Sequence, residues 1–186
     1  MSTIIDDAIL DVETWLDDVV IGLNLCPFAA TPRKNKQVRF TVSQALTEEV
    51  LLADLYAELT LMSQTPAEEV ETSLLIVPDM LNKFDDYNQF LDLADALLEE
   101  FEWDGIFQIA SFHPDYCFAE TDIDSIENLT NRSPYPILHI LREATLEKAL
   151  EKMTSPDEIF KRNIETMNEL PDEKIKALFP YLHLSS

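Results

Sequence analysis

The feature that most constrains the fold is an alternation of strand-like and helix-like segments between residues 37 and 112. Three short segments, 37–43, 70–77 and 106–112, are rich in β-branched and aromatic residues and are typical of β-strands. The segments between them, 47–64 and 85–101, carry apolar residues three and four positions apart, which predicts amphipathic helices. This order predicts an α/β fold, in which helices flank a small central sheet of three to four strands. A ferredoxin-like α+β fold with antiparallel strands is the alternative.

Further helices are predicted at both ends of the chain. Residues 3–23 combine an apolar face with an acidic one. Residues 156–184 are typical of two short helices, because Pro171 interrupts the helical pattern. A length of 186 residues suits one domain. We therefore expect a single domain over 1–186 with a helical C-terminal extension over 156–186.

Another helix is predicted from Ser133 to about residue 153. Serine is a residue type that caps helices, and Pro134 suits the first helical position. This helix would be apolar on two sides, which is typical of an element at the centre of a fold. Before it, residues 116–119 could add a short strand, and residues 120–131 form an acidic loop.

The chain carries 36 acidic and 13 basic residues, which gives a formal net charge of −23. Between Phe40 and Asn131 only Lys83 is basic. Such a surface repels nucleic acids and anionic membranes, so we expect neither as a partner. No apolar segment approaches the roughly 20 residues that cross a bilayer. The N-terminus also lacks the basic start and apolar core of a secretory signal, which predicts a cytoplasmic protein.

Glycine is scarce, with only Gly22 and Gly105 in the chain. Dinucleotide-binding fingerprints and phosphate-binding loops need clustered glycines, so the standard forms of both are absent. The Gly-x-Ser-x-Gly turn of α/β-hydrolases is absent too. No spacing supplies four metal ligands, so we assign no metal site, and the sequence identifies no cofactor.

Candidate functional residues gather in the stretch 105–142, which holds two of the three histidines. His113, Asp115 and Tyr116 directly follow the third predicted strand, and ligand contacts in α/β proteins gather at such strand ends. We interpret His113 as an acid–base group. The alternative is a structural histidine that binds backbone groups at the end of the strand.

The predicted helix over 133–153 supplies a second group of candidates. Five ligand-binding residues lie at its start or along one side: Asn131, Arg132, Tyr135, His139 and Arg142. If this side faces the end of the third strand, His113 and His139 converge on one pocket. The two arginines would then hold a small anionic molecule, because Pro134 and Pro136 remove N–H groups that a helix start offers to an anion. A buried Arg–Glu pair is the structural alternative.

Cys26 is the remaining candidate, at the predicted end of the first helix. Pro27 follows it and stops the helix. We expect Cys26 to act as a nucleophile or redox thiol if the fold brings it to the pocket. An inert buried thiol is the alternative, because a helix C-terminus does not lower the pKa of a cysteine.

Together these features predict a small enzyme or small-molecule-binding protein with a His/Arg pocket for an anionic ligand. The alternative is a non-catalytic interaction module that presents its acidic surface or its C-terminal helices to a protein partner.

Four stretches, GLNLCPF, DYNQFLDLADALLE, FQIASFHPDYCF and ENLTNRSPYPILHILREA, are similar to a family of proteins of about this length. The family occurs in bacteria, has plant relatives and is described as a domain of unknown function. The resemblance extends to about residue 165. It implies a free-standing soluble protein, and it implies no activity, cofactor or site residue.

Overall fold

A computed structural model describes residues 2–151 and 156–182 of the chain. Its centre is a four-stranded sheet with the strand order β1-β2-β4-β3. The strands are β1 (Val38–Val42), β2 (Thr72–Ile76), β3 (Phe107–Phe112) and β4 (Ile137–Arg142). β1 and β2 are parallel, and β4 runs antiparallel to its neighbours β2 and β3. The predicted α/β class is therefore confirmed, and β4 lies between the second and third strands of the alternation.

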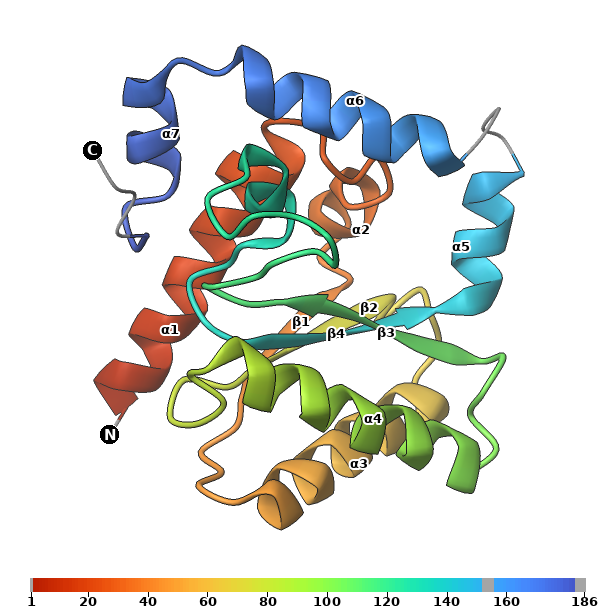
Figure 1. The fold of residues 1–186 in the computed structure, drawn as a ribbon. Coiled ribbons are helices and arrows are strands. Elements are labelled where there is room, and N and C mark those ends of the chain that lie inside the picture. The colour runs from red at the N-terminus through yellow and green to blue at the C-terminus, as the bar shows by residue number, and fades with distance from the viewer. Residues whose placement is uncertain (1, 152–155, 183–186) are drawn as a thin grey trace.

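Helices cover both faces of the sheet, which gives three layers (Figure 1). One face is covered by α3 (Glu48–Gln64) and α4 (Phe84–Glu100). The other is covered by α1 (Ser2–Trp15), its π-helical continuation η1 (Leu16–Ile21), α2 (Ala30–Lys34), α6 (Pro156–Glu169) and α7 (Asp172–Leu178). The 3-10 helix η2 (Ile126–Asn131) precedes β4, and α5 (Glu143–Leu150) follows it. The helices predicted at both ends of the chain are confirmed.

Each helical layer has its own hydrophobic core, and the central strands contribute to both. Leu75 and Leu138 pack in the core of the α3–α4 layer. Leu74 and Ile137 pack in the core of the α1 layer. Because neighbouring residues of a strand point to opposite faces, a strand that is apolar throughout suits this central position.

The helix predicted from Ser133 is wrong in its first half. Residues 137–142 form β4, and the helix begins only at Glu143. The two apolar sides of the predicted helix are the two faces of a buried strand. A short apolar run fits either structure, and here the β-branched residues Ile137 and Ile140 favour the strand. The short strand predicted over 116–119 is also wrong, since those residues are irregular.

No helix within residues 2–151 and 156–182 is both long enough and apolar enough to cross a bilayer.

Candidate functional site

A cavity of about 150 Å³ lies between the sheet and the α1 layer. Its walls are mostly apolar and include Leu16 of η1 and Phe112 of β3. Cys26, Thr72 and His139 add a thiol, a hydroxyl and an imidazole to this lining. These three residues come from the segment after η1, from β2 and from β4, which are distant in sequence.

Thr72 fixes the tautomer of His139. The Thr72 hydroxyl lies 2.7 Å from the carbonyl oxygen of Ile140 and 2.6 Å from Nε2 of His139. A carbonyl oxygen only accepts, so the single hydroxyl proton goes to Ile140. Nε2 must then donate its own proton to the Thr72 oxygen. In the neutral ring, Nδ1 is consequently the acceptor.

Nδ1 of His139 has no hydrogen-bond partner in the part of the chain that the structure describes. The fully buried side-chain polar atoms that lack a partner there are Thr60 Oγ1 and Asn163 Oδ1, and Nδ1 is not among them. The atom is therefore open to a water-sized molecule. His139 is one of the residues that line the cavity.

Burial keeps His139 neutral. It lowers the pKa of the imidazole from 6.5 to about 4, because the charged ring would lose its hydration. At neutral pH the ring can accept a hydrogen bond at Nδ1, and it offers no positive charge to an anion.

Cys26 shares the cavity with His139 as a neutral thiol. Burial raises the pKa of this thiol, and the amides of Phe28 and Ala29 offset the rise only in part. A nucleophilic cysteine needs the thiolate, which a lowered pKa would supply. Both cysteines of the chain are free.

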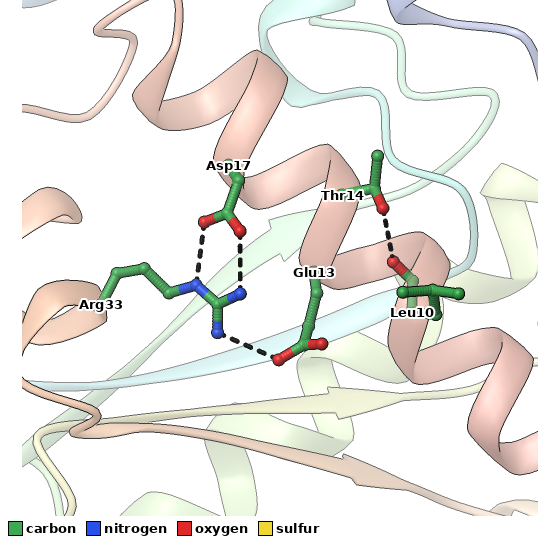
Figure 2. Close-up of polar contacts among 5 residues, drawn as sticks. All are labelled: Leu10, Glu13, Thr14, Asp17 and Arg33. Atoms are coloured by element: carbon green, nitrogen blue, oxygen red, sulfur yellow. Dashed lines mark hydrogen bonds and ion pairs between the residues drawn. The ribbon is translucent and has the colours of Figure 1, made fainter.

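Arg33 of α2 forms ion pairs with residues of α1 and η1 (Figure 2). Its Nε and Nη2 each donate to one carboxylate oxygen of Asp17 at 2.8 Å, and Nη1 donates to Glu13 at 3.0 Å. The guanidinium also lies 5.3 Å from the ring centre of Phe40. Since the neighbouring Pro32 lines the cavity, this ion-pair cluster holds part of the cavity wall in place.

His113 lies outside the cavity lining, and the fold uses both of its ring nitrogens. Nε2 donates to the carbonyl oxygen of Leu81 at 2.9 Å, and Nδ1 accepts the amide of Asp115 at 2.9 Å. The ring packs against Phe84 and Tyr87, and burial lowers its pKa. Leu81 has a φ of 58°, so this hydrogen bond supports a turn in the left-handed region.

Arg132 and Tyr116 belong to the same loop network as His113. The Arg132 guanidinium donates to the carbonyl oxygens of Tyr116 at 3.2 Å and Ile123 at 2.6 Å. The Arg132 carbonyl accepts the indole N–H of Trp15 at 3.0 Å. The Tyr116 ring packs against Phe84, with 5.0 Å between ring centres. These contacts tie the loop between β3 and β4 to α1.

Asn131, Tyr135 and Arg142 have partners in three different places. Asn131 donates to the carbonyl oxygen of Ser111 at 3.1 Å, and the Tyr135 hydroxyl donates to Asp11 at 2.9 Å. The Arg142 guanidinium donates to carbonyl oxygens at and after the end of α3, those of Met62, Thr65 and Val70. It also lies 5.5 Å from the ring centre of Phe107 of β3, whose side chain packs in the core of the α3–α4 layer.

The residues predicted to form one pocket therefore lie in different parts of the structure. Cys26 and His139 share the cavity, and Arg142 also contributes to its lining. The prediction that His113 and Arg132 would meet His139 and Arg142 around one cavity is wrong. It assumed a helix where the chain forms β4, and alternate residues of a strand face opposite layers. The side chains of His139 and Arg142, three residues apart, accordingly have their partners on opposite faces of the sheet.

Sequence reasoning missed two residues that organise this region. One is Thr72, whose only signal is a hydroxyl within a largely apolar strand. The other is Asn128, which is fully buried and had no signal in the acidic loop. Its amide group forms hydrogen bonds with four residues in or next to that loop: Phe118, Thr121, Asp122 and Ile123.

Comparison with known families gives one match. A family model described as "Protein of unknown function (DUF1415)" matches residues 7–177. The chain belongs to this family. The matched residues include Cys26, Thr72 and His139, so the cavity lies within the domain that defines the DUF1415 family. A comparison with curated proteins found no match, and neither did a comparison with solved structures.

The DUF1415 cavity is mostly apolar, and Glu71, Arg142 and Thr145 are also among its lining residues. It combines apolar walls with a neutral acceptor on His139 and a neutral thiol on Cys26. Across residues 2–151 and 156–182, no three His, Cys, Asp or Glu side chains gather as a metal site would require. Such a site can hold an apolar molecule and orient it through one hydrogen-bond donor.

Proposed function

We propose that the chain is a small-molecule-binding protein whose ligand is neutral, largely apolar and held by one hydrogen bond to Nδ1 of His139. The observation that carries this function is that His139, whose Nδ1 has no hydrogen-bond partner among the described residues, lines a mostly apolar cavity. A ligand that donates a hydrogen bond to this acceptor would be oriented by it within the apolar walls.

The volume of the cavity limits the size of the ligand. An apolar cavity of about 150 Å³ can hold a benzene-sized molecule. The aromatic walls supplied by Trp15, Phe28 and Phe112 suit a flat ring or a short branched chain. Pro32, Thr145 and Leu146 also line the cavity and are partly exposed, which favours entry between α2 and α5.

The charge of the ligand follows from the groups around it. An anion would need a cation, and His139 is neutral because of its lowered pKa. The guanidinium groups of Arg132 and Arg142 are used by backbone carbonyl oxygens. We therefore propose a neutral ligand in place of the anionic one that the sequence suggested. No catalytic role is assigned to His113 or Cys26, since His113 has partners at both nitrogens and Cys26 is a neutral thiol.

Phenol and benzene are suitable probes, because they differ by a single hydrogen-bond donor. Their dissociation constants would be measured by NMR titration of the full chain. Phenol is expected to bind about fivefold more tightly than benzene, since one net hydrogen bond contributes about 1 kcal/mol. In His139→Phe, which removes the acceptor and keeps an aromatic ring, this preference should disappear.

A second variant tests whether the probe occupies the cavity. Ala110 lines the cavity on β3 directly opposite His139 in the register of the sheet. Ala110→Leu should fill the space and abolish binding of both probes, while phenol should still bind Ala57→Leu, a variant at an exposed position of α3. If phenol bound Ala110→Leu as it binds the wild type, the cavity would not be its site and the proposed function would be wrong.

A further inference from the structure

Three aromatic side chains form a partly exposed cluster where α4 ends. Tyr56 of α3, Phe101 and Trp103 have ring centres 4.6 to 5.6 Å apart. Tyr56 is 39% exposed and Phe101 44% exposed, and Trp103 is partly exposed. We call these three residues the aromatic patch. At these distances the rings pack on each other, so a partner would contact their outer faces.

Four carboxylates adjoin Phe101 and Trp103 in the chain. Glu99 and Glu100 end α4, and Glu102 and Asp104 flank Trp103 in the chain. All four are exposed. The last turn of α4 contains no basic residue, although the C-terminal end of a helix dipole favours positive charge. The charges at this helix end are therefore the opposite of those that would stabilise it.

Glu102 also adopts a backbone conformation that residues other than glycine disfavour. The amide of Trp103 donates to the carbonyl oxygen of Leu98 at 2.8 Å, which is the longer bond of a Schellman-type helix end. In that motif the residue before Trp103 adopts the left-handed conformation, and glycine is the residue that does so without strain. Glu102 occupies the position with a φ of 56°. Glu102 therefore adopts this conformation at a local cost to stability.

Among the described residues, none of these four carboxylates forms an ion pair. Lys83 is the one basic residue in the sequence between Phe40 and Asn131, and it lies at the opposite end of α4. Arg142 stacks on Phe107, which packs edge-on against Trp103. Its guanidinium nitrogens donate to carbonyl oxygens. The carboxylates around the patch are therefore available to a cation from outside.

We propose that the aromatic patch with its four carboxylates is the docking surface for a protein partner that presents arginine side chains. Charge complementarity supplies the argument for this occupant, since the patch is bordered by acids in a chain of net charge −23. A guanidinium stacks flat on an exposed aromatic face and binds a carboxylate through two parallel N–H groups. Aromatic and arginine side chains dominate the energetics of many protein interfaces.

Hexa-arginine peptide is the probe, and the indole N–H signals of the full chain report where it binds. Trp103 belongs to the patch, whereas Trp15 is buried and its indole donates to Arg132. Titration should shift the Trp103 indole signal and leave that of Trp15 in place. Hexa-lysine should bind at least about threefold more weakly, because an ammonium group does not stack as a guanidinium does.

Two pairs of variants separate the patch from the overall negative charge. Phe101→Ala keeps the net charge and should weaken hexa-arginine binding about fivefold, while Phe160→Ala, at another exposed phenylalanine on α6, should not. Glu102→Gly should weaken binding and raise the urea midpoint of unfolding, because glycine relieves the strained φ. Glu173→Gln, which removes one exposed charge on α7, should leave binding unchanged.

Binding that is equal in wild type and Phe101→Ala would overturn the docking surface, because it would reflect net charge alone. Concentration-dependent dimerisation that Phe101→Ala abolishes would overturn the choice of partner, since the occupant would then be a second copy of this chain. Neither result would affect the phenol titration, which reports on the opposite side of the sheet.

Discussion

His139 donates a hydrogen bond from Nε2 to the hydroxyl of Thr72, across the neighbouring strands β4 and β2, over 2.6 Å. The same hydroxyl donates to the carbonyl oxygen of Ile140. These two bonds fix the proton on Nε2 and leave Nδ1 as an acceptor toward the cavity. The binding property of the cavity therefore depends on a threonine in the middle layer of the fold.

Thr72→Val should destabilise the chain and weaken the preference for phenol. The substitution keeps the shape of the side chain but leaves the Nε2 proton of His139 without a partner, which costs about 1 to 3 kcal/mol. Urea unfolding measures the loss. Thr72→Ser is the matched control, because it retains the hydroxyl and should retain the preference for phenol over benzene. A Thr72→Val protein as stable as the wild type would contradict the assigned hydrogen bond.

The stabilising contribution of the neutral His139 should be lost as the pH decreases from 7 toward 4. The folded-state pKa of His139 is lowered to about 4 from an ordinary value of 6.5. Below pH 6.5 His139 binds a proton in the unfolded chain but not in the folded chain, so protonation favours unfolding. The contribution of His139 to the free energy of unfolding is fully present above pH 6.5. Near pH 4 this contribution has fallen by about 3 kcal/mol. His113 contributes in the same direction, because its pKa is lowered too.

His139→Phe isolates the part of this pH dependence that belongs to one imidazole. Urea unfolding of the wild type and the variant at several pH values between 4.5 and 7.5 gives the two slopes. The variant should be less sensitive to pH by close to one proton around pH 5. Parallel curves would mean that His139 titrates in the folded protein as it does in the unfolded chain.

The sequence allowed most of the fold to be predicted, because most of its elements have a local signal. Thr47 is the N-cap of α3, and its hydroxyl accepts a hydrogen bond from the amide of Val50. The segment 137–142 lacked such a signal. A run that is apolar on every side is compatible with a helix and with a strand, and only its pairing with β2 and β3 decides between them.

The candidate site was predicted less well than the fold, and the reason is physical. Histidine and arginine are scarce in this chain, and for this reason they were predicted to be functional residues. In the structure His113 and Arg132 form hydrogen bonds with carbonyl and amide groups of two loops, one before α4 and one between β3 and β4, which a sequence cannot reveal. Cys26 and His139 line the same cavity because the chain returns through β4, and that placement is set by tertiary structure alone.

Arg33→Ala should loosen the α2 side of the cavity. It removes the paired hydrogen bonds to Asp17 and the bond to Glu13, and because the cluster is partly exposed the loss of stability should be about 1 kcal/mol. Alkylation of Cys26 by iodoacetamide, followed in a Cys117→Ser background, should become faster. The exposed neighbour Lys34 provides the control, and Lys34→Ala should change neither quantity. Unchanged labelling in Arg33→Ala would show that the ion pairs do not hold this wall.

Asn128→Ala should destabilise the chain by at least about 2 kcal/mol, because it leaves several buried loop groups without partners. Urea unfolding measures the loss. At a concentration of urea where the variant is still folded, its affinity for phenol should match that of the wild type, since the loop lies outside the cavity lining. The exposed Asp124→Ala is the control and should change stability little. A stable Asn128→Ala protein would mean that the loop does not depend on this amide.

The most direct test of the cavity is the NMR signal of the two ring nitrogens of His139 at pH 7, with and without phenol. We predict a protonated Nε2 and an unprotonated Nδ1 in the free protein, and a shift of the Nδ1 signal that saturates as phenol is added. A ring protonated on Nδ1, or an Nδ1 signal that phenol leaves unchanged, would contradict the proposed binding site.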